Sequence, residues 1–261
     1  MTRAMIPPRG VLLDIAGVLM AGEDALPGAV EAVGRLASAG VPYRFVTNTT
    51  SKPRRLVLAA LRNAGFPAEE GQLFTPAGAA RGWLAEHRLA PHLLTAPALA
   101  EDFSGLDPDA PPAVVVGDAG SGFSYENLNR ALRLLLDGAP LVALAMNRRF
   151  TDTAGRPTLD AGAFVTALSY ASGVEPILFG KPASDFFTAA CADLGTAPAE
   201  VAMIGDDAEA DIAGALNAGI GQAILVRTGK YRAGDEAACA PAPSAIARDI
   251  GEAVEALLAS G

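Results

Sequence analysis

Acidic residues cluster in one short stretch of the chain, where Asp206 and Asp207 follow an apolar segment and Asp211 comes four residues later. The apolar segment is typical of a buried strand, and Asp211 falls in the first turn of the helix expected after it. Carboxylates this close repel one another unless a cation lies between them, and hard oxygen ligands of this kind suit Mg²⁺. Attraction to the helix dipole is the competing explanation; it accounts for Asp211 well and for the adjacent pair poorly.

Polar residues also follow three other predicted strands. Asp14 interrupts a run of apolar residues, and Thr47 with Asn48 comes directly after another such run. Lys181 follows a third, between a glycine that lets the backbone approach a ligand and a proline that suits the start of a helix. Taken singly, each has an ordinary alternative: an Asp that caps a turn, a Thr-Asn turn, and a lysine exposed to solvent.

These positions gain meaning when they are taken together, because ligands of open parallel sheets gather at the carboxyl ends of the strands. One crevice can then hold Asp14 as a nucleophile, Thr47 as a hydroxyl partner for a phosphoryl oxygen, and Lys181 as a cation. The acidic cluster with Mg²⁺ completes the groups that phosphoryl transfer needs. The residues therefore predict this chemistry at one edge of a sheet.

Strands and helices alternate at both ends of the chain, which indicates a doubly wound α/β core with a parallel sheet. The strands predicted for this core cover residues 10–19, 41–46, 177–179, 201–204 and 222–226. Its predicted helices lie within residues 27–40, 51–65, 184–194 and 211–217. The middle of the chain has its own strands at 113–116 and 141–145, helices at 79–87, 125–136 and 161–172, and a polar loop at 147–155. We therefore expect a core domain of residues 1–79 and 179–261, with a smaller α/β domain inserted at 80–178.

The composition excludes several classes of protein. The 261 residues include 20 Lys+Arg and 29 Asp+Glu, and the net charge of −9 argues against a nucleic-acid binder, which needs a basic face. Two Cys and two His are too few for a disulfide framework or a multi-histidine metal centre. No stretch reaches the ~18 uncharged apolar residues that span a bilayer, so we expect no membrane segment and a cytoplasmic protein.

Four ordered segments resemble the motifs of the haloacid dehalogenase (HAD) superfamily: Asp14-Ile-Ala-Gly-Val-Leu, Val46-Thr-Asn, Gly180-Lys-Pro, and Gly205-Asp-Asp with Asp211. Only 33 positions separate the first two motifs, whereas 134 separate Thr47 from Lys181. The long second gap is similar to that of the NagD-like phosphatases, which carry a C2 cap domain there. Segments that begin at Phe123, Gly180 and Val226 further resemble the group that includes phospholysine phosphohistidine inorganic pyrophosphate phosphatase.

The resemblance implies a catalytic role for three residues. Asp14 would attack phosphorus and form an aspartyl-phosphate. Thr47 would hydrogen-bond the phosphoryl group, with Asn48 beside it, and Lys181 would steady both the phosphate and the nucleophile. The enzyme would be a phosphatase, a hydrolase of phosphoric monoesters or diphosphates, acting on a small phosphorylated metabolite.

The resemblance also implies ligands for Mg²⁺ and for the substrate. The ion would be held by Asp14, the backbone carbonyl of Ala16 and Asp206, with Asp207 or Asp211 acting through water. The substrate would be selected by three polar residues of a cap loop, Asn147, Arg148 and Arg149. Relatives often form dimers through the cap, so a homodimer is a further expectation.

One position departs from the pattern of the family. Most phosphatases of the superfamily carry a second Asp two residues after the nucleophile, where it protonates the leaving group and then activates water; this chain has Ala16. General acid–base assistance is worth ~10²–10⁴-fold in rate. We therefore expect a phosphatase that is weak, or selective for good leaving groups such as those of pyrophosphate, acyl and aryl phosphates and P–N compounds. The alternative is a HAD-like protein that binds phosphate compounds or partners and catalyses little.

Overall fold

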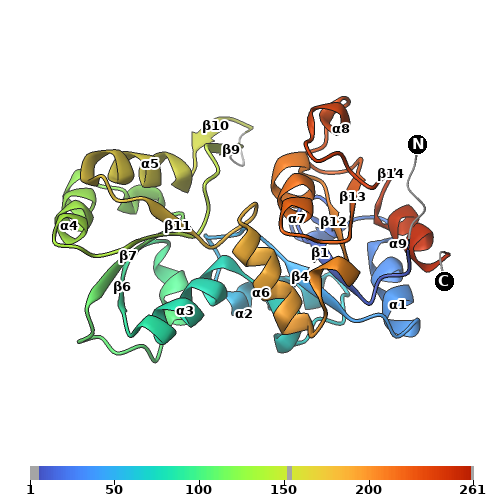
Figure 1. Ribbon diagram of the computed structural model, residues 1–261, viewed down its shortest axis with the longest axis horizontal. Helices are drawn as coiled ribbons and strands as arrows, with labels where there is room; N and C mark the ends of the chain where they lie inside the picture. The colour runs from blue at the N-terminus through green and yellow to red at the C-terminus, as the bar shows by residue number, and fades with distance from the viewer. Residues whose placement is uncertain (1–5, 152–154, 260–261) are drawn as a thin grey trace. The chain divides into compact units, whose positions relative to one another are not determined.

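Two compact units make up the structure, a computed structural model that describes residues 6–151 and 155–259 (Figure 1). The first unit consists of Met1–Thr47, Val57–Phe74 and Lys181–Gly261, and the second of Asn48–Leu56 and Thr75–Gly180. The sequence placed the domain boundaries at 79/80 and 178/179, whereas the units change at 74/75 and 180/181 and exchange the short segment between 47/48 and 56/57. The difference at 74/75 arises because Thr75 caps a helix whose residues Ala77 and Ala80 pack in the core of the second unit.

The first unit contains a six-stranded sheet, in the order β14-β13-β12-β1-β4-β5. Its strands are β1 (Gly10–Asp14), β4 (Tyr43–Val46), β5 (Leu73–Phe74), β12 (Val201–Gly205), β13 (Gln222–Val226) and β14 (Ala245–Ala247). Every neighbouring pair is parallel. The predicted parallel α/β core is confirmed, and β12, β1 and β4 are adjacent strands within it. The strand predicted for this core at 177–179 is an exception, because it pairs in the four-stranded sheet of the second unit.

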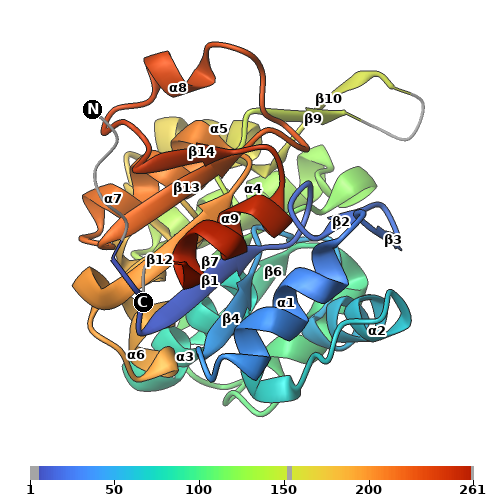
Figure 2. The same ribbon diagram turned by 90° about the vertical axis from the view of Figure 1, so that its right-hand side faces the viewer.

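Helices cover both faces of this sheet, which is why its strands are apolar on both sides. In β1, Val11 and Leu13 pack in one apolar cluster and Leu12 in the other. The helices are α1 (Ala29–Ser38), α2 (Arg54–Asn63), α6 (Ser184–Leu194), α7 (Gly214–Asn217), α8 (Asp235–Ala238) and α9 (Ile250–Leu258). Helices α1 and α9 lie next to each other over one face (Figure 2). In the described part of the chain, no helix is both long and apolar enough to cross a membrane.

The second unit has a parallel four-stranded sheet of its own, in the order β11-β8-β7-β6. Its strands are β6 (Ala90–Leu94), β7 (Pro112–Val116), β8 (Leu141–Ala143) and β11 (Pro176–Leu178). Its helices are α3 (Pro76–His87), α4 (Tyr125–Leu136) and α5 (Ala161–Ser172). Helix α3 packs on one face of the strands, and α4 and α5 pack on the other (Figure 1).

Several elements differ from the sequence-based expectations. Strand β6 was not predicted, because Pro91 weakens the strand signal; as an edge strand, β6 tolerates a proline. The predicted polar loop contains an antiparallel pair, β9 (Arg149–Thr151) and β10 (Pro157–Leu159). The apolar run 10–19 continues past β1 into a turn at Gly17 and a short hairpin of β2 (Met20–Ala21) and β3 (Asp24–Ala25). The helix expected at 211–217 begins earlier, with a π-helix over Ala208–Ala213.

Candidate active site

Three polar residues stand at the carboxyl ends of the three central strands. Asp14 is the last residue of β1, Thr47 directly follows β4, and Asp206 directly follows β12. Because these strands are parallel neighbours, their ends meet at one edge of the sheet. All three side chains are buried, with at most 6% of their surface exposed.

Lys181 lies at the centre of the site. Its Nζ donates to Oδ1 of Asp14 at 2.5 Å and to Oδ1 of Asp211 at 2.6 Å, and only 3% of its surface is exposed. Burial disfavours the ammonium, but the two carboxylates outweigh it and raise the pKa of Lys181 above its ordinary value. Lys181 therefore stays charged and fixes the relative position of Asp14 and Asp211.

Asp211 is held by both of its oxygens. Its Oδ2 accepts the backbone N–H groups of Asp206 at 3.2 Å and Asp207 at 3.1 Å, while its Oδ1 faces Lys181. A carboxylate that accepts several N–H donors is fixed in orientation. This arrangement connects the end of β12 to the π-helix that carries Asp211.

Asp14, Asp206 and Asp211 form a group whose ligand oxygens lie within 4.8 Å of one another. The pKa of Asp14 is raised to about 7 and that of Asp206 to about 6, chiefly by burial and also by the neighbouring carboxylates, against the opposing effect of Lys181 on both and of Lys230 on Asp206. When all three carboxylates are ionised, the Lys181 ammonium compensates one charge, and two negative charges remain in a buried place. Hard oxygen donors with this charge deficit fit a divalent cation such as Mg²⁺.

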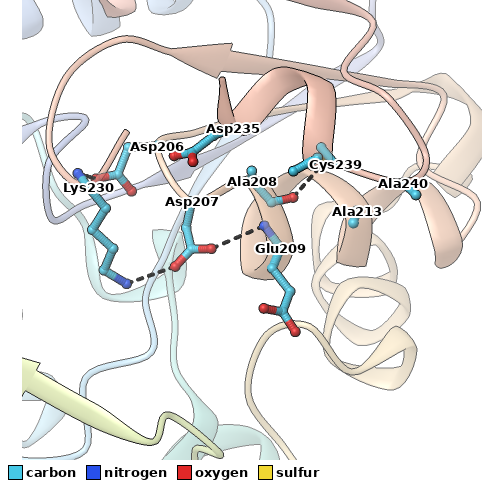
Figure 3. A pocket seen from close by; sticks show the side chains of 10 residues that line it. Asp206, Asp207, Ala208, Glu209, Ala213, Lys230, Asp235, Cys239 and Ala240 are labelled. Atoms are coloured by element: carbon cyan, nitrogen blue, oxygen red, sulfur yellow. Dashed lines mark hydrogen bonds and ion pairs between the residues drawn. The ribbon is translucent and has the colours of Figure 1, made fainter. Parts of the chain in front are cut away.

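Asp207 takes a different place from Asp211. Its Oδ2 accepts a hydrogen bond from Lys230 Nζ at 3.0 Å, and its Oδ1 accepts one from the N–H of Glu209 (Figure 3). The N–H of Ala210 also donates to Oδ1, at the start of the π-helix. Burial alone would raise the pKa of Asp207, but these hydrogen bonds and the Lys230 ammonium lower it below its ordinary value. The sequence did not decide whether Asp207 or Asp211 lies closer to the metal site. In the structure, Asp211 belongs to the three-carboxylate group. Asp207 instead lines an adjoining pocket of about 460 Å³.

Gly205 leaves the space that the Asp211 carboxylate occupies. A Cβ at this position would overlap Cβ and Cγ of Asp211. We expect Gly205→Ala to lower the stability by about 1–3 kcal/mol, as overpacking typically does. That corresponds to a fall in Tm of about 2–4 °C per kcal/mol, measurable by calorimetry.

Gly34 offers the matched control for this prediction. It lies inside α1, and a Cβ there would meet no atom within 4 Å. Gly34→Ala is expected to raise the stability by about 0.4–1 kcal/mol, because alanine restricts the unfolded chain. Equal effects of the two substitutions would contradict the crowding at Gly205.

The remaining predicted residues belong to the second unit, except Ala16. Asn48 opens the segment Asn48–Leu56, and its side chain lies close to Gly180 of the same unit. Asn147 and Arg148 lie between β8 and β9, and Arg149 is the first residue of β9. The Asn147 carbonyl accepts the N–H of Gly162 at 3.1 Å, and both arginines are exposed. Ala16, in the loop after β1, is also exposed.

A loop that the sequence analysis gave no role also reaches the site. Lys230 donates its backbone N–H to Oδ2 of Asp206 at 2.7 Å, and Thr228 donates its hydroxyl to the carbonyl of Gly17 at 2.5 Å. The place of residues 227–231 in the sequence could have identified this loop, because they follow β13, another parallel strand of the same sheet. Their side chains are not acidic, so a search for metal ligands passes over them.

Comparison with known proteins places the chain in a family. The model of the haloacid dehalogenase-like hydrolases matches residues 11–107, and a HAD-hydrolase-like model matches residues 178–253. Haloacid dehalogenase-like hydrolase domain-containing protein 2 of Rattus norvegicus is 42% identical over 250 residues, which cover 96% of each chain. Phospholysine phosphohistidine inorganic pyrophosphate phosphatase of Rattus norvegicus is 41% identical over 256 residues, which cover 96% of this chain and 94% of the relative.

Solved structures share the fold over almost the whole chain. The p-nitrophenyl phosphatase from Archaeoglobus fulgidus has a TM-score of 0.86 at 26% identity and covers 95% of this chain and 99% of its own. NagD from E. coli K-12 has the same fold, with a TM-score of 0.82 at 24% identity over 95% of this chain and 98% of its own. The resemblance that the four motifs indicated is confirmed. The chain belongs to the haloacid dehalogenase-like hydrolases, and its structural neighbours are the NagD-like phosphatases.

Proposed function

We propose that this HAD-superfamily phosphatase is Mg²⁺-dependent and hydrolyses small phosphorylated compounds through an aspartyl-phosphate on Asp14. The observation that carries the proposal is the Lys181 ammonium, which binds Asp14 and Asp211 inside a buried group of three carboxylates. A nucleophile, a fixed cation and a place for a divalent ion are thereby present within one cluster.

Each residue of the cluster has its own role in the proposed reaction. An oxygen of Asp14 bonds to phosphorus as the bond to the leaving oxygen breaks, and the electron pair departs with the leaving group. Lys181 orients Asp14 and offsets negative charge, and the Thr47 hydroxyl holds a phosphoryl oxygen. When bound by Asp14, Asp206, Asp211 and the Ala16 carbonyl, Mg²⁺ would supply further charge neutralisation. Water then attacks the phosphorus of the aspartyl-phosphate, which releases phosphate and restores Asp14.

Ala16 determines which leaving groups depart readily. A methyl group cannot donate a proton, so an alkoxide of high pKa would have to leave unprotonated. Phosphate, carboxylate and aryloxide leaving groups depart without that help, and a protonated P–N compound brings its own proton. This selectivity agrees with the activities in the names of one relative, a pyrophosphate phosphatase, and of one structural neighbour, a p-nitrophenyl phosphatase.

Substrate selection falls in this proposal to the second unit, which would act as the C2 cap. Its candidate contacts are four polar residues, Asn48, Asn147, Arg148 and Arg149. Two arginine side chains suit an anionic substrate, because guanidinium groups bind phosphate and carboxylate oxygens in a bidentate way. The homodimer through this unit stays a prediction.

A series of phosphomonoesters with leaving groups of graded pKa tests the proposal. We expect kcat/KM to fall steeply as the leaving-group pKa rises, with aryl phosphates and pyrophosphate hydrolysed fastest. Removing the metal with EDTA should abolish phosphate release, and Mg²⁺ should restore it. A flat dependence together with brisk turnover of alkyl phosphates would contradict the role given to Ala16, and full activity in EDTA would contradict the metal.

Ala16 also favours the second candidate, a protein that binds phosphate compounds and catalyses little. The same series separates the two functions. A binding protein would take up Mg²⁺ and phosphate, detectable by calorimetry, and would turn over neither p-nitrophenyl phosphate nor pyrophosphate. Activated esters are the substrates for which the loss of an acid matters least, so their inertness would favour binding alone.

A further inference from the structure

The loop 228–230 after β13 connects two parts of the carboxylate site. Thr228 donates its hydroxyl to the carbonyl of Gly17, which lies three residues beyond Asp14. Two residues further along, Lys230 donates its backbone N–H to Oδ2 of Asp206. The loop therefore contacts both the chain segment that leaves the nucleophile and a carboxylate of the candidate metal site.

Between these two contacts, the chain approaches itself through two glycines that have no side chains. Gly17 and Gly229 both have positive φ, 85° and 60°, and face each other. A Cβ on Gly17 would lie 2.8 Å from Cα of Gly229, and a Cβ on either glycine would overlap Oδ2 of Asp206. Two turns thus approach the same carboxylate oxygen so closely that no side chain fits between them.

This contact holds the Asp206 carboxylate in one orientation. Its Oδ2 accepts the Lys230 N–H and lies against the two glycines, so the loop fixes the position of this oxygen. The Gly17 segment is held from the other side, where the Gly17 N–H donates to the carbonyl of Met20 at 2.8 Å. The Thr228 hydroxyl is the side-chain bond that ties this segment to the β13 loop.

We propose that Thr228 is a positioning residue, whose hydroxyl holds the Ala16–Gly17 segment and the Asp206 carboxylate at the separation that Mg²⁺ requires. The inference rests on the proposed function, because it concerns the same metal site. The role proposed for Thr228 is indirect, because its hydroxyl binds the Gly17 carbonyl. Thr228 acts through Gly17, whose preceding peptide contains the Ala16 carbonyl, and through the loop that orients Asp206. Partners of this kind typically contribute 10–100-fold to metal affinity or activity.

Thr228 is a better probe of the loop than Lys230. The Lys230 ammonium pairs with Asp207, so removing it would free a carboxylate beside the site and change the net charge there. Thr228→Val removes only the hydroxyl and keeps the shape and the charge. Thr228→Ser restores the donor and is the conservative rescue. Thr188→Val is the matched control, because Thr188 also donates to a backbone carbonyl, that of Ser184 at 3.0 Å within α6 of the same unit.

The test measures the dissociation constant of Mg²⁺ by calorimetry on metal-stripped protein, together with the Mg²⁺ dependence of kcat and the Tm of the apo protein. Thr228→Val is expected to raise the dissociation constant about tenfold. Thr228→Ser should stay within about threefold of the unsubstituted protein, and Thr188→Val should leave the dissociation constant unchanged.

The outcomes separate this inference from the function on which it rests. A lower Tm in Thr228→Val with an unchanged dissociation constant and Mg²⁺ dependence would make Thr228 merely structural and overturn the inference. A Thr228→Ser variant as impaired as Thr228→Val would overturn it as well. If the unsubstituted protein hydrolyses p-nitrophenyl phosphate in EDTA and binds no Mg²⁺, the metal-dependent function and the inference both fail.

Discussion

Phosphate release by the Asp14→Asn variant is expected to fall by at least about 10³-fold, because an amide cannot replace the carboxylate nucleophile. The substitution is nearly isosteric and leaves a carbonyl oxygen to accept Lys181. Burial already raises the pKa of Asp14 to about 7, so a neutral group is tolerated at this position and the fold should persist. The measurement is the release of p-nitrophenol from p-nitrophenyl phosphate at saturating Mg²⁺, with the Tm recorded beside it.

Asp24→Asn is the matched control for this experiment. Asp24 is an exposed residue of β3 in the same unit and is not a member of the carboxylate cluster, so its substitution removes the same charge from outside that cluster. The control should keep the rate of the unsubstituted protein. Undiminished phosphate release by Asp14→Asn would assign the activity to another site or to a contaminating enzyme.

Ala16→Asp is expected to accelerate hydrolysis of alkyl phosphates by ~10²–10⁴-fold, the usual contribution of a positioned acid and base. The introduced carboxyl group would protonate the leaving alkoxide and afterwards take a proton from the attacking water. Ala16 is exposed, so an aspartate fits there without displacing the core. The ratio of kcat/KM for an alkyl phosphate to that for p-nitrophenyl phosphate measures the effect.

The ratio isolates proton transfer from other changes at this position. Aryl leaving groups need little protonation, so their rates should change far less than those of alkyl phosphates. Ala16→Asn has the size and polarity of the aspartate without its acidity and should leave the ratio unchanged. Equal gains for both substrate classes, or an asparagine variant as fast as the aspartate variant, would contradict the explanation based on leaving-group protonation.

Much of the fold and of the candidate site could be predicted from the sequence, because the sequence patterns that indicate them are local. Apolar runs bounded by glycine and proline located β1, β4, β12 and β13, and parallel pairing then brought Asp14, Thr47 and Asp206 to one edge. The choice between Asp207 and Asp211 could not be made. It depends on the π-helix, whose geometry turns Asp211 toward Lys181 and Asp207 toward Lys230. The Thr228–Gly17 contact joins residues 211 positions apart, and no local sequence pattern reports it.

The division of the chain between units has a consequence for recombining relatives. The boundaries at 47/48 and 180/181 leave Thr47 and Lys181 with the first unit, and their immediate neighbours Asn48 and Gly180 with the second. Segment Asn48–Leu56 is bound within the second unit, where Thr50 accepts the N–H of Asp118 at 3.0 Å. A chimera that takes only residues 75–180 from a homologue would therefore divide the second unit between two proteins. A chimera intended to transfer substrate specificity must include residues 48–56 as well.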